Sequence, residues 1–83
     1  MMHFYNAQKT LRMHSLQTRK TSHMTQEQMA ENLQISVRSY SDLEHGKCNF
    51  SCRTLFNYLF LLNEEEAIII ISDIISSMHQ TLE

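Results

Sequence analysis

Apolar residues recur three and four positions apart along most of this chain, a spacing typical of helices that bury one face. The pattern is clearest over residues 24–47, where two short repeats flank a turn at Gln34 and Ile35. The first repeat consists of Met29, Ala30 and Leu33, and the second of Tyr40 and Leu43. We therefore predict two short helices that are joined by a tight turn and bury these residues.

Polar residues beside these repeats predict where the two helices begin and end. Thr25 is followed three residues later by Gln28, which is the spacing of a capping box at a helix start. Ser36 is placed to cap the second helix by accepting a hydrogen bond from an exposed backbone N–H group. Gly46, the only glycine in the chain, is predicted to end that helix in a left-handed conformation. The second helix then covers residues 36–45.

The second helix leaves one face outside the buried repeat. This face carries Val37, Arg38, Ser41, Asp42 and His45. Two helices that cross over so short a turn leave the second one at the surface, with its N-terminal residues presented outward. That geometry is typical of an element that enters the DNA major groove.

The same stretch resembles the Cro/repressor (xenobiotic-response-element, XRE) family of helix-turn-helix proteins. The matching residues are Thr25 and Gln26, Met29 and Ala30, Ile35 and Ser36, the run from Leu43 to Lys47, and Ser51, Thr54 and Leu55. The ending Leu-Glu-His-Gly-Lys is specific, because a generic helix-turn-helix does not need it. The chain departs from the family at Gln34, where glycine is usual, and at Asp42, where many members have a neutral or basic residue.

The resemblance implies a fold, a function and a set of contacts. The fold is all-α, a five-helix bundle of the lambda-repressor-like type, and the function is sequence-specific binding of a double-stranded DNA operator by a transcriptional regulator, a repressor. The implied base-reading residues are Val37, Arg38 and Asp42, the phosphate-contacting residues are Gln26, Ser39, His45 and Lys47, and Arg19 and Glu44 form a structural ion pair. A plainer interpretation stays open for each polar position. Asp42 would then be solvated or support Arg38, and the others would be surface residues without a partner.

The flanking segments complete the expected helices. We predict a loose leader over residues 1–5, a first helix over residues 6–20 of uncertain register, and a fourth helix from the cap Ser51 to Leu62, with Phe50 as an apolar plug before it. The core face of the fourth helix is expected to hold Leu55, Tyr58, Leu59 and Leu62, extended by Phe56 and Phe60.

A C-terminal helix is predicted over residues 63–82, and it is apolar on more than one face. Asn63 and Glu66 have capping-box spacing, which favours a helix over a strand for the β-branched run from Ile68 to Ile71. One stripe consists of Ile68, Ile71, Ile75, Met78 and Leu82, and a neighbouring stripe of Ala67, Ile70 and Ile74. We expect one stripe to cover the bundle and the other to form a homodimer interface. The first stripe is our candidate for the interface, but the sequence does not settle which of the two faces the partner. The alternative is that both stripes belong to the chain's own core.

Composition supports one small helical domain over residues 1–83, with no proline and 42% hydrophobic residues. The net charge of −2 is uneven: the first 53 residues carry +3 and the last 30 carry −5, so a basic head precedes an acidic tail. No stretch approaches the roughly 20 apolar residues of a membrane span, and no signal-peptide pattern is present, so we expect a cytoplasmic protein.

Other chemistry is not indicated by the sequence. His45, Cys48 and Cys52 lie close together, but a structural zinc site needs four ligands at defined spacing. No phosphate-binding loop or nucleophile motif appears, so we expect no enzyme activity, cofactor or small-molecule ligand. The overall acidity and Asp42 leave a second function class open, a protein-interaction module on the same scaffold that does not bind DNA.

Overall fold

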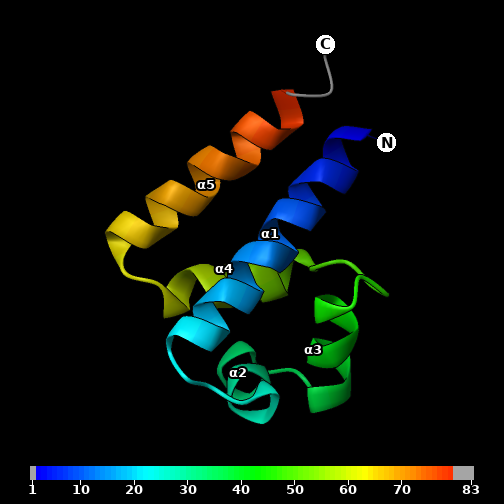
Figure 1. The fold of residues 1–83 in the computed structure, drawn as a ribbon, viewed down its shortest axis with the longest axis vertical. Coiled ribbons are helices and arrows are strands. Elements are labelled where there is room, and N and C mark those ends of the chain that lie inside the picture. Colours follow the sequence, from blue (N-terminus) through cyan, green and yellow to red (C-terminus); the bar gives the residue numbers. More distant parts are fainter. Residues whose placement is uncertain (1, 80–83) are drawn as a thin grey trace.

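Five helices make up residues 2–79, the part of the chain that the computed structural model describes (Figure 1). They are α1 (Met2–Thr21), α2 (Gln26–Leu33), α3 (Val37–Glu44), α4 (Cys52–Leu61) and α5 (Glu64–His79). Every regular element in this range is helical, so the all-helical prediction is confirmed and the strand alternative for Ile68–Ile71 is wrong. The radius of gyration, 12.4 Å, fits a single domain of this length. None of the helices in this range is long and apolar enough to cross a bilayer.

The helices are arranged around α1. The two longest, α1 and α5, lie side by side with the first turn of one next to the last turn of the other (Figure 1). At the opposite end of α1, α2 packs against both α3 and α4, and α1 also contacts α3. The α2–α3 unit therefore lies at one end of the molecule, away from the paired ends of α1 and α5.

The start of α1 corrects one prediction. The loose leader expected over residues 1–5 is helical from Met2 onward, whereas Met1 lies outside the described residues. The physical reason is a tertiary contact, because His3 Nδ1 donates to the Met78 carbonyl at 2.9 Å and Asn6 Nδ2 donates to the Ser77 carbonyl at 3.1 Å. These bonds attach the first turns of α1 to the end of α5, which extends the helix beyond the expected start at residue 6.

All of the predicted helix caps are formed. Thr25 and Gln28 exchange both bonds of a capping box, at 3.1 and 2.9 Å. Ser36 accepts from the Ser39 N–H group at 3.0 Å, and Ser51 accepts in the same way at the start of α4. The pair at the start of α5 is also present, because Asn63 and Glu66 bond each other's backbone N–H groups. Local side-chain chemistry thus sets the start of α2, α3, α4 and α5.

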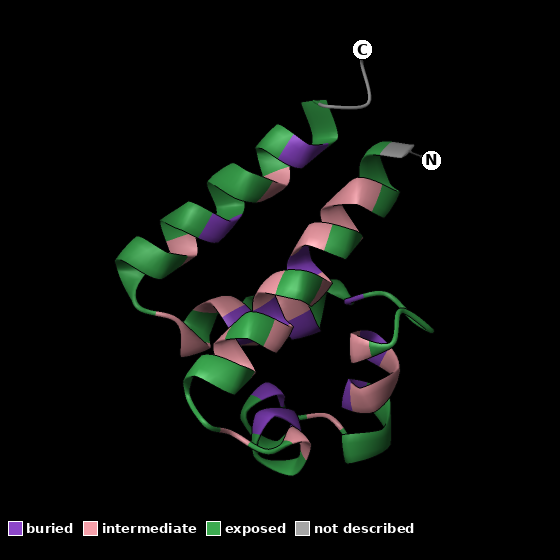
Figure 2. Cartoon of the chain, in the orientation of Figure 1, coloured by how far each residue is buried: buried purple, intermediate pink, exposed green. Residues whose placement is uncertain are grey.

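The core lies where α1, α2, α3 and α4 meet, and α5 covers one side of it (Figure 2). Its buried apolar residues are Leu11, Met29, Ala30, Leu33, Tyr40, Leu43, Phe50, Tyr58 and Ile70. The plug predicted at Phe50 is confirmed, since this residue is only 6% exposed.

Two aromatic residues of α4 were expected inside and are outside. Phe56 is 63% exposed and Phe60 is 93% exposed, whereas Tyr58 of the same helix is fully buried. At 100° per residue, Phe56 and Phe60 share a face opposite Thr54 and Tyr58, and no described helix covers that face. Leu55, Leu59 and Leu62 are partly buried, so the rest of the expected core face is confirmed.

Only one of the two apolar stripes of α5 packs on the bundle. Ile70 is fully buried, and Ala67 and Ile74 are partly buried on the same stripe. The other stripe is exposed, with Ile68, Ile71, Ile75 and Met78 each at least 36% accessible, whereas Leu82 lies outside the described residues. The alternative in which both stripes fill the chain's own core is therefore wrong for the single chain.

Candidate nucleic-acid interface

The turn between α2 and α3 contains a residue other than glycine in the left-handed conformation. Gln34 has φ 60° and ψ 40°, the left-handed conformation, and its N–H group donates to the Ala30 and Glu31 carbonyls at the end of α2. Gly46, which follows α3, has φ +73° as predicted. Left-handed backbone suits glycine and is strained for other L-residues, so the departure at Gln34 carries a conformational cost.

The inward side of α3 is fixed by its two predicted core residues. Tyr40 is fully buried and Leu43 is 3% exposed, as expected. On the outer side, Val37 is 45% exposed although it is apolar, and Arg38 beside it is exposed. Helix α3 therefore presents an aliphatic side chain and a guanidinium group together at its N-terminal end.

Asp42 follows Arg38 by one helical turn on α3. It is half-buried, on the side of α3 that faces the following loop, where burial and the nearby charge of Asp42 raise the pKa of Cys48. Arg38 has no ion pair within the described chain, so the interpretation of Asp42 as its support finds no contact here. The structure exposes Val37 and Arg38 at the start of α3 and leaves Asp42, one turn after Arg38, half-buried.

The ion pair between Arg19 and Glu44 is present and joins α1 to α3. Arg19 Nε donates to Glu44 Oε2 at 2.6 Å and Nη2 donates to Oε1 at 3.2 Å, while Nη1 donates to the Met24 carbonyl at 3.1 Å. The two side chains are 17% and 7% exposed. Burial acts to raise the pKa of Glu44, but the bonds from Arg19 and Gln26 and the nearby Tyr40 hydroxyl outweigh it, so this pKa lies below its usual value.

Gln26 is a third member of this network, which the sequence did not indicate. Its Nε2 donates to Glu44 Oε1 at 2.9 Å, so the amide predicted to grip a phosphate is also attached to α3. One bond uses one of the two amide hydrogens, and the side-chain oxygen stays free to accept. The start of α2 is thereby held at a fixed position relative to the end of α3.

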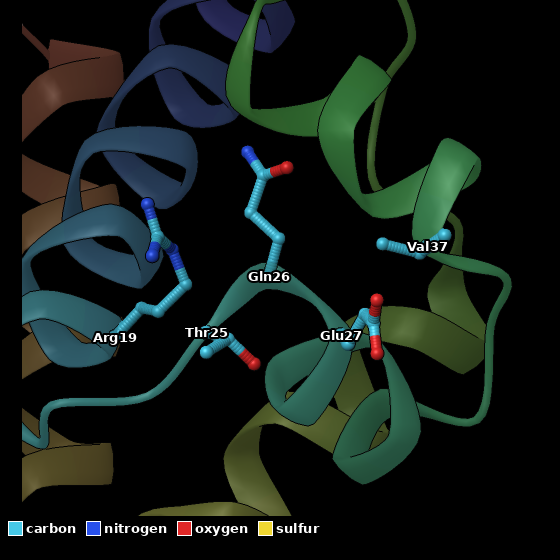
Figure 3. A pocket seen from close by; sticks show the side chains of 5 residues that line it. All are labelled: Arg19, Thr25, Gln26, Glu27 and Val37. Carbon is cyan, nitrogen blue, oxygen red and sulfur yellow. The ribbon is translucent and has the colours of Figure 1, made fainter.

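A hollow of about 540 Å³ lies between the starts of α2 and α3. Figure 3 shows its lining, with Arg19 on one side, Glu27 and Val37 on the other, and Thr25 and Gln26 between them. The hollow thus connects a predicted phosphate contact, Gln26, to a predicted base contact, Val37. Sequence reasoning missed Glu27, whose carboxylate adds negative charge where a phosphate would approach. A second hollow, at the start of α5, is lined by Asn63, Glu64, Glu65 and Ile68 and lies outside this unit.

The remaining predicted phosphate contacts flank α3. Ser39 is exposed, and its hydroxyl oxygen accepts from the Ser36 hydroxyl at 2.9 Å, which leaves its own proton free to donate. His45 Nδ1 donates to the Ser41 carbonyl at 2.7 Å, so Nε2 can donate to a phosphate only when the ring is protonated. Lys47 is exposed in the loop that follows.

Metal chemistry finds no support in the described part of the chain. No group of three or more His, Cys, Asp or Glu side chains there is arranged to hold a metal ion. Cys48 and Cys52 are both free and exposed.

Comparison with known proteins leaves the function to be argued from these contacts. No protein-family model, no curated protein and no solved structure matches the chain.

Proposed function

We propose that this chain is a sequence-specific DNA-binding transcriptional regulator of the Cro/repressor (XRE) helix-turn-helix type that reads the major groove with α3. The observation that carries the proposal is the division of α3 into two faces. Its inner face is fixed by Tyr40, Leu43 and the Arg19–Glu44 pair, and its outer N-terminal end presents Val37 and Arg38 to solvent. A helix held in this way can enter a groove without losing its orientation. We further propose that the protein is a cytoplasmic repressor.

Base reading is assigned to Val37, Arg38 and Asp42. The guanidinium group of Arg38 matches the O6 and N7 acceptors of guanine, and Val37 can pack on the methyl group of thymine. Asp42 can accept from the N4 amino group of cytosine. Because Asp42 is half-buried, a base can reach it from fewer directions than it can reach the exposed Val37 and Arg38.

Phosphate binding is assigned to Gln26, Ser39, His45 and Lys47. Gln26 lies at the N-terminus of α2, where backbone N–H groups and the helix dipole also favour an anion. The other three are exposed, Ser39 in the first turn of α3 and His45 and Lys47 just after its last turn. Contacts of this kind position a protein on the duplex and carry no sequence information by themselves.

We also propose a homodimer formed through the exposed stripe of α5, Ile68, Ile71, Ile75 and Met78, with Leu82 as a further predicted member. A contiguous exposed apolar patch usually marks an interface. A twofold dimer would place two copies of α3 on two half-sites about 34 Å apart, one helical turn of DNA.

The experiment is a salt titration of binding to mixed-sequence duplex DNA, followed by fluorescence anisotropy. Binding should weaken steeply as salt rises, because each contacted phosphate releases counterions. A plot of log K against log salt has a negative slope, and Lys47→Ala should make this slope shallower by about 0.9. The substitution should also weaken binding to all sequences alike. Lys20→Ala, which removes the same charge from an exposed position on α1, is the matched control and should leave the slope unchanged. A change of sequence preference in Lys47→Ala would mean that Lys47 reads bases.

A second candidate is a protein-interaction module without DNA binding. It is favoured by the carboxylates of Glu27 and Asp42 near α3 and by the exposed rings of Phe56 and Phe60 on α4. The same titration separates the two functions, because a protein-only module would bind duplex DNA weakly at every salt concentration.

A further inference from the structure

Arg12, in the middle of α1, lies against Gly46 at the end of α3. A Cβ atom at Gly46 would come within 3.0 Å of Arg12 Nη1, 3.3 Å of Cζ and 3.7 Å of Nε. All three atoms belong to the guanidinium group, so the charged end of Arg12 occupies the space that the missing side chain leaves. Glycine at position 46 therefore meets two requirements. It leaves room for the guanidinium group of Arg12, and it adopts a positive φ.

The guanidinium group of Arg12 has no anionic partner in the described chain. The ion pair there is that of Arg19 and Glu44, and none of the hydrogen bonds of the described residues uses a guanidinium nitrogen of Arg12. Arg12 is nevertheless half-buried, so its position is determined by packing. An arginine whose five guanidinium N–H donors have no partner among the described residues is suited to bind an anion with two parallel bonds, as it does with phosphate.

The surroundings indicate where such an anion would come from. Gly46 stands between His45 and Lys47, two residues assigned to phosphate contact, and Arg12 approaches the same point from another helix. We propose that Arg12 is a further phosphate-contacting residue, which reaches past Gly46 and binds the same DNA backbone as Lys47. This inference rests on the proposed DNA-binding function.

A purely structural role for Arg12 makes a different prediction. The C-terminus of a helix carries partial negative charge, and a cation placed there stabilises the helix without any ligand. In that case removing Arg12 would lower the stability of the fold and leave the salt dependence of DNA binding unchanged. The phosphate role changes the salt dependence itself, so the two roles are separable in one set of variants.

The test compares Arg12→Ala, Arg12→Gln, Arg12→Lys and Lys20→Ala with the unsubstituted protein on mixed-sequence duplex DNA, at temperatures where all are folded. We expect Arg12→Ala and Arg12→Gln to make the negative slope of log K against log salt shallower by about 0.9. Their loss of affinity should then shrink roughly threefold between about 50 and 200 mM salt. Arg12→Lys keeps the charge and should keep the slope, and so should Lys20→Ala.

Two outcomes would overturn the assignment. One is an unchanged slope in Arg12→Ala, whatever happens to its melting temperature. The other is an equal fall in slope for Lys20→Ala, which would show an effect of net charge alone. Failure of the unsubstituted protein to bind DNA is distinct from both, because it would refute the proposed function and remove the basis for Arg12 together with it.

Discussion

Two fully buried tyrosines differ in what their hydroxyl groups contact. The Tyr58 hydroxyl lies 2.5 Å from His14 Nδ1 and 2.8 Å from Thr18 Oγ1, which connects α4 to α1. The Tyr40 hydroxyl is buried without a hydrogen bond in the described chain, although the Glu44 carboxylate lies close enough to act with burial in raising the pKa of Tyr40. Burial raises the pKa of Tyr58 to about 12. The Tyr58 hydroxyl is therefore hydrogen-bonded, whereas the equally buried Tyr40 hydroxyl is not.

Removing each hydroxyl should have different consequences for stability. Tyr58→Phe should lower the free energy of unfolding by about 1–2 kcal/mol, because it removes the hydrogen bonds of the buried hydroxyl to the half-buried His14 and Thr18. Tyr40→Phe should cost less than Tyr58→Phe, at most about 0.5 kcal/mol, since the Tyr40 hydroxyl makes no hydrogen bond in the described chain and only its weaker interaction with the Glu44 carboxylate is lost. Urea unfolding of the two variants measures both values, and equal losses would show that the Tyr40 hydroxyl has a partner.

Glu44 should make the stability of the fold depend on pH. Its pKa in the folded chain lies below the usual value of 4.5, so the carboxylate stabilises the folded state above that value. The free energy of unfolding should fall as the pH decreases from about 4.5 through the lower folded pKa. Glu44→Gln should flatten this decline, and Glu31→Gln, at an exposed position of α2, should retain it. Parallel pH profiles for the unsubstituted protein and Glu44→Gln would contradict the role of the Arg19–Glu44 pair.

At the scale of the helices, local signals were sufficient for most boundaries. Thr25, Ser36, Ser51 and Asn63 each cap a helix through a bond to a residue three positions away, and short-range spacing of this kind can be read from sequence. The start of α1 could not be, because it depends on bonds from His3 and Asn6 to residues more than 70 positions away.

The site was predictable to a smaller extent, for the same reason. The exposure of Val37 and Arg38 follows from the burial of Tyr40 and Leu43 on the same short helix. Gln26 is hydrogen-bonded to Glu44, and Arg12 lies close to Gly46. Both contacts join distant parts of the chain, so the spacing of residues along the sequence could not predict them.

Where a helix has apolar residues on more than one face, the sequence did not determine which face is buried. The apolar character of Phe56 and Phe60 did not show which side of α4 is covered, because that depends on how α4 packs against α1 and α2. The same holds for α5, where Ile70 and Ile71 are neighbours with opposite exposure.

The left-handed residue after α2 offers a test of how this turn is stabilised. Gln34→Gly should raise the free energy of unfolding by about 0.5–1 kcal/mol, because glycine adopts positive φ without strain, while its greater freedom in the unfolded chain limits the gain. Glu31→Gly, at an exposed position inside α2, should instead lower it by about 1 kcal/mol. Thermal unfolding of both variants distinguishes them, and a loss of stability in Gln34→Gly would show that the glutamine side chain contributes a contact.

The reading role of α3 is tested by Arg38→Ala on a duplex site selected by the unsubstituted protein. We expect a loss of about 1–3 kcal/mol in binding free energy and a relaxed preference at one base pair. Lys20→Ala removes an equal charge from an exposed position outside α3 and should keep the preference at every position. An unchanged preference in Arg38→Ala would exclude Arg38 from the base-reading residues.

For the whole molecule, polarity is distributed by region. The α2–α3 unit and the adjoining part of α1 carry the basic groups proposed to meet DNA, while α5 carries an acidic first turn and an exposed isoleucine stripe. An apolar stripe at a distance from the end proposed to bind DNA is suited to self-association, because it leaves α3 uncovered.

The proposed dimer can be tested by charge substitution in this stripe. Ile71→Lys together with Ile75→Lys should give a monomer in sedimentation at micromolar concentration, or unfold the chain if folding and dimerisation are coupled. Ile69→Lys is the matched control, since Ile69 is 55% exposed on α5 but outside the stripe, and it should remain dimeric. A monomeric unsubstituted protein that forms one-to-one complexes with DNA would contradict the dimer.

The most direct measurement of the proposed function is selection of bound sequences from a random pool of duplex DNA by the unsubstituted protein. We predict enrichment of an inverted repeat whose half-sites have centres about 34 Å apart, roughly 10 base pairs, because two copies of α3 related by a twofold axis would occupy successive major grooves. A pool that stays as random after selection as before it would contradict sequence-specific DNA binding by this protein.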